Sequence, residues 1–370
     1  MEPDRVRAMN RILLQAVFDA EAMHVFHHMP ESRLRELVDG FRRARIAVLG
    51  DFFLDKYLET DPALAEVSIE TGKTAHQVVE IRCSPGAAGT VCCNLAALGV
   101  GSLHAIGFTG DDGESFDLRK GLERLGCSTD HLHVAAERKT PTYLKPRDVS
   151  LPGLEGEHNR YDTKNRSKTP VEIEDAILAS LDAMLPRIDA LIVLDQVEEA
   201  DCGAVTSRVR QAIGRRAEAF KNVVFWADSR LRIREFCGVT IKPNQFEAIG
   251  RENPPPGEVV DIEELAKAVQ SLAEENKVVV CATRGADGMI VSHPEPTLVF
   301  GVRVDGPIDP TGAGDSATAG AVLALCAGAT FPEAALVGNL VASVTVTRLA
   351  TTGTASPEEL FERLRRWWMQ

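Results

Sequence analysis

A short glycine-containing stretch near the C-terminus combines the residue types that phosphoryl transfer requires. The chain reads Asp309-Pro310-Thr311-Gly312-Ala313-Gly314-Asp315-Ser316 and continues into an Ala-rich stretch that predicts a helix ending near Gly328. Backbone N–H groups at the start of a helix lack intrahelical acceptors, and with the helix dipole they bind phosphate or a developing oxyanion. Asp315, in the first turn, could take the proton of an attacking hydroxyl. The stretch therefore predicts an anion site beside a carboxylate base, as phosphoryl transfer to an alcohol needs.

Two other interpretations of this stretch stay open from these residues alone. Asp315 could simply cap the helix, because Asp and Ser are favoured at that position. The spacing Gly312-x-Gly314-x-x-Ala317 also matches a variant of the dinucleotide fingerprint, which would favour a nicotinamide-dependent dehydrogenase. That fingerprint should follow a buried strand directly, whereas residues 305–307 (Asp-Gly-Pro) predict a turn.

A second polar pair follows a short strand predicted over residues 239–241. Asn244 and Glu247 are three residues apart at the expected start of a helix, so they share one face of it. An amide and a carboxylate in this arrangement could hold a hydrated Mg²⁺ ion, which needs few protein ligands. A capped helix N-terminus with an acid in its first turn explains the same residues without a metal.

Two further glycine-containing segments could approach a ligand closely. Thr283, Gly285 and Gly288 follow a strand predicted over residues 278–281, and the glycines allow a tight turn beside a nucleotide. The same residues could form a hairpin because a strand resumes at residue 289, and both interpretations can hold together. Residues 85–90 (Pro-Gly-Ala-Ala-Gly-Thr) precede a helix and could either admit a ligand or serve close helix packing.

Length and composition restrict the class of protein. At 370 residues the chain suits one large α/β domain with an appendage, or two domains. The net charge of −13 argues against a general nucleic-acid binder, although a local basic pocket could still bind an anionic substrate. The eight cysteines have no zinc spacing and indicate a reducing compartment. Since neither a signal peptide nor a membrane-spanning apolar run is recognisable, we expect a cytoplasmic protein without a membrane partner.

The order of the predicted elements indicates an α/β fold. From residue 170 onward helices and apolar strands alternate, which predicts a parallel sheet covered by helices on both faces. The predicted strands are 190–194, 223–226 and 278–281, the helices between them are 172–185, 203–219 and 262–275, and the closing helices are 331–346 and 357–367.

The first half of the chain follows a different pattern. Residues 4–43 predict helical runs on both sides of Pro30, ahead of a first strand at 46–49. Gly50-Asp51 then ends that strand at the carboxyl edge of the sheet, where ligands of α/β proteins bind. Residues 55–85 and 142–145 predict strands of a separate small sheet, with a loop or flap over 146–169.

Taken together and in this order, these segments resemble the ribokinase-like (PfkB) carbohydrate kinases over residues 44–368. The most specific part is residues 309–316, which are similar to the family signature Asp-Thr-Gly-Ala-Gly-Asp-Thr with one insertion. The resemblance implies that Asp315 is the catalytic base and that Gly312, Ala313 and Gly314 form the anion hole. It links Asn244 and Glu247 to Mg²⁺ and phosphate. The implied nucleotide-binding positions are Thr283, Gly285, Gly288 and Thr311.

Within the family, the chain looks most like the kinase module of the bacterial heptose-7-phosphate kinases. The segments that carry this likeness are Gly50-Asp51, Leu54-Asp55, Pro85-Gly86-Ala87-Ala88, Leu98-Gly99, Arg160-Tyr161-Asp162, Gly353-Thr354 and Ser356-Pro357. The implied substrate-binding residues are Asp51, Asp55, Gly86, Ala87, Thr90, Lys145 and Arg160. Asp51 would hold sugar hydroxyls, and Lys145, Arg147 or Arg160 could meet a phosphate already on the sugar. Ala87 and Thr90 depart from the Gly and Asn of the family pattern, at positions where the sugar should bind.

The resemblance implies a ribokinase-like three-layer α/β/α fold with a mostly parallel central sheet and a small β-sheet lid. Residues 1–43 would be an N-terminal helical extension and 44–370 the kinase domain, with lid strands from about 55–85 and 140–165. The implied ligands are ATP, Mg²⁺ and a sugar or sugar phosphate; a monovalent cation near residues 309–311 and 345–353 is common in the family. A lid that pairs two subunits implies a homodimer. A sensor of the same fold that binds sugar or nucleotide without catalysis is the alternative function.

Overall fold

The centre of the molecule is a six-stranded sheet in which all neighbouring strands are parallel. The computed structural model describes residues 23–252, 254–255, 257–349 and 353–370. The strand order is β11-β10-β9-β2-β5-β6. The strands are β2 (Arg45–Gly50), β5 (Ser102–Thr109), β6 (Cys127–Val134), β9 (Ala190–Asp195), β10 (Val224–Ser229) and β11 (Thr240–Ile241). The predicted parallel sheet is therefore confirmed.

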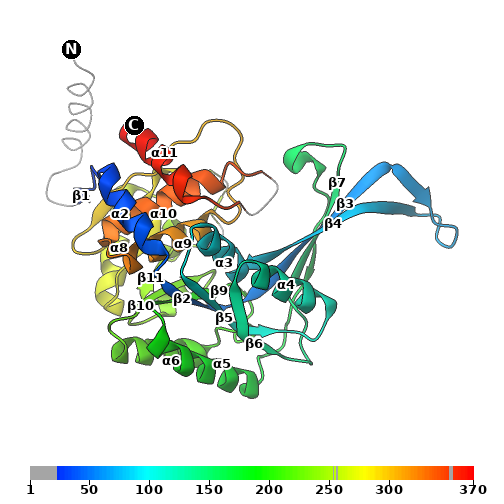
Figure 1. Cartoon of the computed structure of the whole chain (residues 1–370), viewed down its shortest axis with the longest axis horizontal. Helices are drawn as coiled ribbons and strands as arrows, with labels where there is room; N and C mark the ends of the chain where they lie inside the picture. The colour runs from blue at the N-terminus through cyan, green and yellow to red at the C-terminus, as the bar shows by residue number, and fades with distance from the viewer. Residues whose placement is uncertain (1–22, 253, 256, 350–352) are drawn as a thin grey trace, which may run out of the picture.

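Helices cover both faces of this sheet (Figure 1). Those on one face are α2 (Glu31–Phe41), α3 (Ala88–Ala97), α4 (Gly113–Arg124), α9 (Ala313–Cys326), α10 (Phe331–Thr345) and α11 (Pro357–Trp368). Those on the other face are α5 (Val171–Met184), α6 (Ser207–Ala219) and α8 (Ile262–Asn276). Within the described ranges, no helix is long and apolar enough to cross a lipid bilayer.

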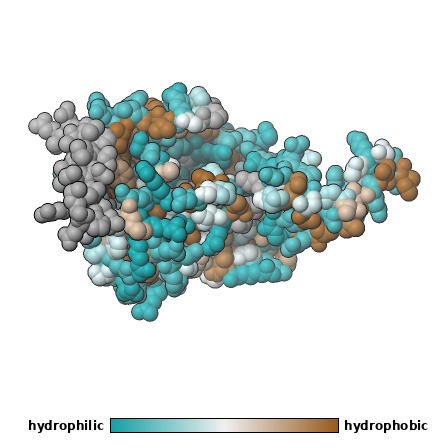
Figure 2. All heavy atoms as spheres, turned by 90° about the horizontal axis from the view of Figure 1, so that it is seen from above, coloured by the Kyte–Doolittle hydropathy of each residue, from teal (hydrophilic) through white to brown (hydrophobic). Residues whose placement is uncertain are grey.

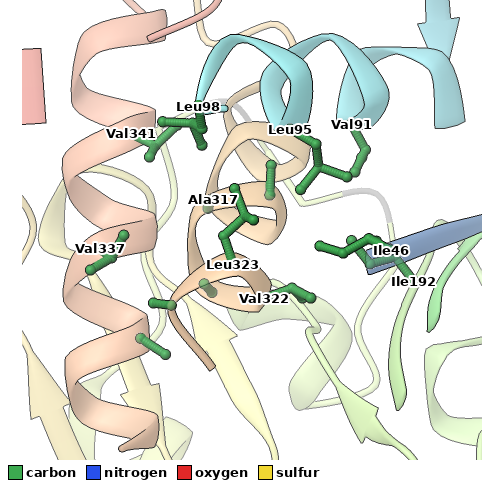
Figure 3. Packing of buried hydrophobic residues seen from close by; sticks show 14 of the residues in the cluster. Ile46, Val91, Leu95, Leu98, Ile192, Ala317, Val322, Leu323, Val337 and Val341 are labelled. Atoms are coloured by element: carbon green, nitrogen blue, oxygen red, sulfur yellow. The ribbon is translucent and has the colours of Figure 1, made fainter. Parts of the chain in front are cut away.

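Alternate residues of the central strands supply two separate cores. Ile46 and Ile192 point to the side of α9, where they lie near Val322 (Figure 3), while Ala47 and Leu191 belong to the core on the opposite side. This alternation follows from the period of two along a strand. Because each central strand is buried on both faces, it appears in the sequence as a continuous apolar run.

The Ala-rich helix α9 packs very closely against α10. A Cβ atom on Gly320 would lie 2.7 Å from Cγ2 of Val341, and one on Gly338 would lie 2.8 Å from the carbonyl oxygen of Ala317. Small side chains at these positions let the two backbones approach each other. The contact holds α9 in place, and the first turn of this helix carries Asp315, as predicted.

The N-terminal segment differs from its prediction. Residues 24–30 were expected to be helical, but His24–Val25 form β1, which pairs in parallel with β14 (Thr297–Val299). The expected helix over residues 4–22 lies outside the described residues. Helix α2 is confirmed after Pro30, and its residues Leu34, Leu37 and Phe41 are buried in the core. A strand of two residues leaves no periodicity for a sequence pattern to detect.

A smaller sheet continues the edge of the central one. Strands β12 (Cys281–Thr283), β13 (Met289–Val291) and β14 are antiparallel neighbours, with β1 at the end. Single parallel bridges between Ile241 and Val280 and between Asn244 and Thr283 connect it to the β11 edge. The segment 283–288 is thus a hairpin turn, as one of the two open interpretations predicted.

A third sheet projects from the body as an arm, here called the lid (Figure 1). Its strands are β3 (Phe52–Val67), β4 (Thr74–Ala87), β7 (Thr142–Asp148) and β8 (Tyr161–Thr163), in the order β4-β3-β7-β8. Strand β3 follows β2 with only Asp51 between them, so the lid is tied directly to the central sheet. The predicted small sheet is confirmed, and the predicted flap over 146–169 includes the end of β7, a 3-10 turn at 153–156 and β8.

The junction between β4 and α3 contains a strained residue. Ala87 has φ 53° and ψ −118°, a backbone conformation that suits glycine and is unfavourable for a residue with a Cβ atom. A Cβ atom on its neighbour Gly86 would lie 2.7 Å from Oδ2 of Asp55, so a side chain there would require Asp55 to move. The departure from the family's Gly-Gly pair thus places an alanine where the backbone favours glycine.

We therefore expect Ala87→Gly to stabilise the protein. Relief of the strain should raise the free energy of unfolding by about 1 kcal/mol, measured by denaturant titration. The matched control is Ala96→Gly in α3, where the helical backbone favours alanine and the same change should lower stability by roughly 0.5–1 kcal/mol. Equal destabilisation by both changes would show that Ala87 is not strained.

Candidate active site

The first turn of α9 lies at the centre of the candidate site. Gly312 precedes the helix with φ 77°, a left-handed conformation that suits glycine. Oγ of Ser316 donates a hydrogen bond to the carbonyl oxygen of Gly312 at 2.8 Å, and the N–H of Ala313 donates to the carbonyl oxygen of Pro310 at 3.1 Å. Of the three predicted anion-hole residues, Gly312 and Gly314 line the cavity beside Asp315, whereas Ala313 lines only an adjacent, largely apolar cavity.

Asp315 is a carboxylate whose proton affinity is raised by its surroundings. Burial in the cleft and then the nearby carboxylate of Asp228 raise the pKa of Asp315 to about 7, while the ammonium group of Lys242 opposes this shift. A carboxylate with a pKa near neutrality is a better proton acceptor than an ordinary aspartate and is still substantially ionised at neutral pH. These are the properties required of a general base.

Three connected cavities meet around this turn. The first, about 220 Å³, is largely apolar and is lined by Thr283, Gly285 and Gly288 among others. The second, about 520 Å³, shares Thr283, Gly285, Pro310 and Gly314 with the first, and it contains Asn244 and Glu247. The third, about 330 Å³, lies under the lid and shares Gln196, Arg230, Gly312 and Asp315 with the second. Asp315 and Gly312 therefore stand at the junction between the second and third cavities.

The third cavity collects most of the predicted sugar-binding residues. It is lined by Asp55, Ala87, Thr90, Lys145 and Arg160. Thr311, which was predicted to bind nucleotide, also lines this cavity and does not line the apolar one. Gly86 lies beside it, adjacent to Asp55. Lys145 and Asp55 form a buried ion pair with an N–O distance of 2.9 Å, and Nζ of Lys145 also donates to the hydroxyl of Tyr57 at 3.2 Å.

Two arginines line this cavity. Arg160 stacks on the ring of Tyr143, 4.1 Å from its centroid, and pairs with Asp162. Arg230 pairs with Glu198 and is half exposed. Arg147 is absent from the cavity lining; its guanidinium group donates to the carbonyl oxygen of Gly153 and pairs with the carboxylate of Glu59.

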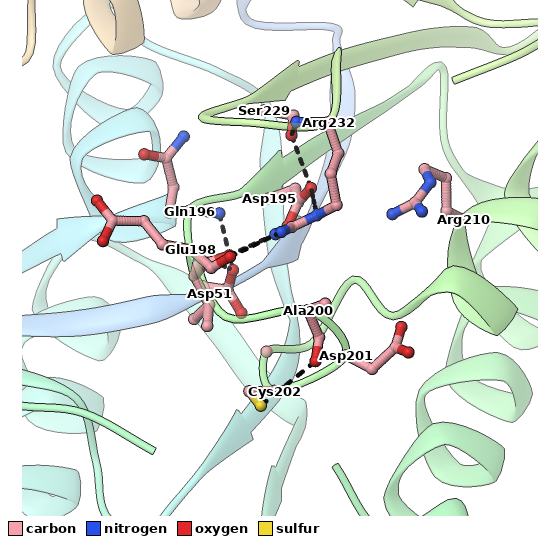
Figure 4. A network of polar contacts seen from close by, with 12 residues as sticks. Asp51, Asp195, Gln196, Glu198, Ala200, Asp201, Cys202, Arg210, Ser229 and Arg232 are labelled. Atoms are coloured by element: carbon pink, nitrogen blue, oxygen red, sulfur yellow. Dashed lines mark hydrogen bonds and ion pairs between the residues drawn. The ribbon is translucent and has the colours of Figure 1, made fainter. Parts of the chain in front are cut away.

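Asp51 has a supporting position behind the site (Figure 4). Its carboxylate accepts hydrogen bonds from the backbone N–H groups of Gln196, Val197 and Ala204 at 2.7–3.0 Å, and it does not line the cavity under the lid. Burial, with the nearby Asp195, raises the pKa of Asp51 to about 6 despite these three donors. Asp51 thus orients the loop that presents Gln196 to the cavity, and direct sugar binding by Asp51 stays a prediction.

Asn244 and Glu247 form a capping box at the start of α7 (Gln245–Ala248). Oδ1 of Asn244 accepts hydrogen bonds from the N–H groups of Phe246 and Glu247, and Oε2 of Glu247 accepts one from the N–H of Asn244. The helix-capping interpretation is therefore confirmed, and it leaves the other carboxylate oxygen of Glu247 available. Burial and the nearby Asp228 raise the pKa of Glu247 to about 7, although its hydrogen bond from Asn244 opposes this.

These carboxylates fit a weakly coordinated Mg²⁺ ion better than a closed metal cage. In the part of the chain that the structure describes, no three His, Cys, Asp or Glu side chains converge to hold a metal. Mg²⁺ typically uses one or two carboxylates plus phosphate oxygens, and a divalent cation near Glu247 and Asp228 would relieve their mutual repulsion. A monovalent-cation site stays a prediction, because residues 350–352 of its second loop lie outside the described residues.

Several residues of the cleft were missed by sequence reasoning. Asp228 lies near the end of β10, Arg230 follows that strand, Lys242 follows β11, and Gln196 follows β9. All of them therefore lie at the carboxyl edge of the parallel sheet, where ligands of such folds bind. The rule that singled out Gly50-Asp51 would have found these residues if it had been applied to every predicted strand.

A larger cavity of about 690 Å³ lies on the other side of the 284–288 turn. It is lined by Phe26, Arg284, Phe300 and Trp367 among others, and it shares Ala286 and Gly301 with the apolar cavity of about 220 Å³. Since none of the polar groups around Asp315 lines it, we do not assign it to the active site.

Known proteins are similar to this chain in sequence and in fold. The family model of the pfkB family carbohydrate kinases matches residues 46–359. The bifunctional protein HldE of Shewanella amazonensis is 30% identical over 336 residues, and that of Gluconobacter oxydans is 27% identical over 335 residues. These alignments cover 90% and 89% of this chain and 66% of each relative, so the chain spans slightly less than two thirds of their length.

Solved structures show the same architecture at low sequence identity. Ribokinase from Thermotoga maritima has a TM-score of 0.61 at 20% identity, covering 87% of this chain and 99% of that one. Phosphofructokinase-2 from Escherichia coli has a TM-score of 0.62 at 18% identity, covering 87% and 98%. The resemblance inferred from the motifs is thus confirmed: the chain belongs to the pfkB family of carbohydrate kinases, phosphotransferases with a ribokinase-like fold.

Proposed function

We propose that this protein transfers the γ-phosphoryl group of ATP to a hydroxyl of a sugar phosphate of the heptose phosphate class. The observation that carries the proposal is the position of Asp315 and Gly312, which line both the cavity under the lid and the cavity that leads to the 283–288 turn. A hydroxyl in the first cavity and a phosphate chain in the second would meet at this turn. That arrangement suits in-line transfer between two bound substrates.

The reaction follows from the groups at this junction. The oxygen of the sugar hydroxyl attacks the γ-phosphorus of ATP, and Asp315 accepts the proton of that hydroxyl. The bond between the γ-phosphorus and the oxygen that bridges to the β-phosphate breaks, and ADP leaves. Backbone N–H groups at Gly312 and Gly314 donate to the negative charge of the transferring group. Glu247 and Asp228 would hold Mg²⁺, which neutralises charge on the phosphates. The lid strands β3 and β7 cover the acceptor and limit access of water.

The choice of a phosphorylated sugar rests on the charges of the cavity under the lid. Arg160 and Arg230 bring two guanidinium groups to its walls, and Lys145, on the lid strand β7, brings an ammonium group that pairs with Asp55. Guanidinium groups bind phosphate through paired hydrogen bonds, so a sugar that already carries a phosphate suits this cavity. The sequence likeness to heptose-7-phosphate kinases supports the heptose class.

The direct test is ADP release from Mg-ATP with a panel of acceptors that includes heptose 7-phosphate, fructose 6-phosphate and ribose. We expect turnover with a sugar phosphate, and we expect Asp315→Asn to reduce it by about 10²- to 10⁴-fold because the proton acceptor is lost. The variant should keep its fold and its affinity for ATP, which thermal shift with Mg-ATP would check. Near-normal turnover by Asp315→Asn would exclude the proposed base. Absence of wild-type turnover with retained ATP binding would favour the sensor alternative.

A pH profile tests the same residue independently. Because the base acts when ionised and its pKa is raised to about 7, kcat/KM should fall as the pH decreases below about 7 and level off above it. The residual activity of Asp315→Asn should lack this step. A wild-type profile that is flat between about pH 5.5 and pH 8.5 would contradict the role of Asp315 as the titrating base.

We also propose that two copies associate through the lid. The β3–β4 arm extends beyond the body and exposes apolar side chains, visible along the projecting arm in Figure 2. They are Leu64, Val67, Ile69, Val78, Val79 and Ile81, of which Ile69 is 98% exposed. Exposed apolar side chains on a sheet are unfavourable in water and are covered when a second sheet packs on them.

Charged substitutions in the arm should separate the subunits. We expect light scattering after size exclusion to show a dimer for the wild type and a monomer for the double variant Val79→Glu and Ile81→Glu, because buried carboxylates would oppose sheet packing. Val171→Glu is the matched control, since Val171 is 52% exposed at the start of α5, on the body of the protein. A monomeric wild type, or a double variant that stays dimeric, would exclude this interface.

A further inference from the structure

The cavity of about 690 Å³ beside the 284–288 turn has no role in the mechanism above. Its walls come from segments that are far apart in the sequence: the chain after β1, the start of α8, the residues that follow β14 and the end of α11. Cavities of this volume typically hold a small organic ligand. The charges and rings in its walls indicate which kind of ligand would fit.

The 284–288 turn separates this cavity from the apolar cavity of about 220 Å³. Ala286 and Gly301 line both cavities. The contact between these segments is close, because a Cβ atom on Gly301 would overlap the carbonyl oxygen of Ala286, and one on Gly288 would overlap that of Val299. The turn and the chain after β14 thus form a common wall, and a ligand in the larger cavity would lie on the side away from Asp315.

Arg284 brings a guanidinium group to this wall without a close counter-ion. Its side chain is only 11% exposed, yet Nη1 lies 3.8 Å from Oδ2 of Asp287, whose own side chain is 59% exposed. Nη2 lies 3.5 Å from the carbonyl oxygen of Val260, which is at the upper limit for a hydrogen bond. Nε is buried, and it has no hydrogen-bond partner among the described residues.

Another buried arginine shows how unusual these contacts are. The side chain of Arg232 is 12% exposed, and its Nη2 and Nε atoms donate to the carboxylate of Asp195 at 2.6 and 3.0 Å. Arginine is rarely buried unless it is paired, and a guanidinium group binds carboxylate, sulfonate or phosphate oxygens through parallel hydrogen bonds. A bound anion would supply the acceptors that Arg284 lacks.

Aromatic side chains form the opposite part of the ligand preference. Phe26, Phe300 and Trp367 line the cavity, and the ring centroids of Phe26 and Trp367 are 6.3 Å apart. Phe300 is 38% exposed, although aromatic rings favour burial. Asp261 also lines the cavity, but its carboxylate already accepts hydrogen bonds from two N–H groups at the start of α8.

We infer that this cavity is a second ligand-binding site, which takes an organic anion with an aromatic body. The anionic group pairs with Arg284, and the ring packs among Phe26, Phe300 and Trp367. The site is separate from the cleft around Asp315. The inference goes beyond the proposed function and does not depend on kinase activity.

Naphthalene-2-sulfonate is a suitable probe because it combines a flat aromatic body with one negative charge. The neutral naphthalene-2-sulfonamide has the same ring and nearly the same shape. In titration calorimetry with saturating Mg-ADP, we expect one sulfonate to bind per chain and the sulfonamide to bind at least about tenfold more weakly. This comparison uses the wild-type protein alone, so it decides the question even if a variant does not fold.

Arg284→Met should weaken sulfonate binding by at least about tenfold, because methionine keeps an apolar stem and removes the guanidinium group. Arg160→Met is the matched control. Arg160 also places a guanidinium group beside an aromatic ring, that of Tyr143, but in the cavity under the lid. Its loss should change the affinity for the sulfonate by less than about twofold.

Four results would overturn the inference. No binding of the sulfonate by the wild type at millimolar concentration would reject the site, and equal binding of the sulfonamide would reject its preference for an anion. Displacement of the sulfonate by Mg-ADP, or an equal loss of binding in Arg160→Met, would place the probe in the active-site cleft instead.

Discussion

The start of α9 presents backbone N–H groups and the positive end of the helix dipole to the cleft, and both favour a bound anion there. The rest of the candidate site is arranged around this turn. Gly312 turns the chain into the helix with a positive φ, and Gly314 keeps the first turn free of a side chain. The close packing of α9 on α10 through Gly320 and Gly338 then fixes the direction of the helix. A shift of this helix would misplace the anion turn and Asp315 together.

The acidic residues beside the anion site disfavour one another's ionised forms, and this changes their proton affinities. Asp315 and Glu247 both have a pKa raised to about 7, because burial and the common neighbour Asp228 disfavour their ionised forms. For Asp315 this is useful, since a raised pKa makes it a stronger proton acceptor. At Glu247 the same negative surroundings would favour the divalent cation that we propose to bind there, since it would relieve the repulsion. Lys242 contributes a positive charge inside the protein to the same balance.

The acceptor side of the site depends on the lid. Because β3 continues from β2 after Asp51, a single stretch of chain carries the supporting carboxylate of Asp51 and the cavity residue Asp55. The return strand β4 brings Gly86 against Asp55 and then enters α3 through the strained Ala87. This geometry tolerates an alanine only at a cost in stability, so the departure from the family pattern has a local physical consequence without removing the cavity.

Local patterns in the sequence determined much of this protein. The alternation of helices and apolar strands predicted the parallel sheet, and residues 309–316 predicted a helix start with an acid in its first turn. These features were readable because each depends on neighbours in the chain. The sequence also singled out Asn244 and Glu247 as a pair. Their spacing alone did not distinguish helix capping from binding of a metal ion.

Only the tertiary structure decided which distant residues share the cleft. Asp228 and Arg230 lie at the end of β10 and Lys242 follows β11, and no spacing in the sequence indicates that Lys242 reaches Gly314. The structure likewise placed Asp51 behind a loop, where three backbone N–H groups donate hydrogen bonds to its carboxylate. The physical reason is that a sequence records local backbone preference and burial, whereas the direction of a polar side chain is set by whichever donor or acceptor the folded chain brings next to it.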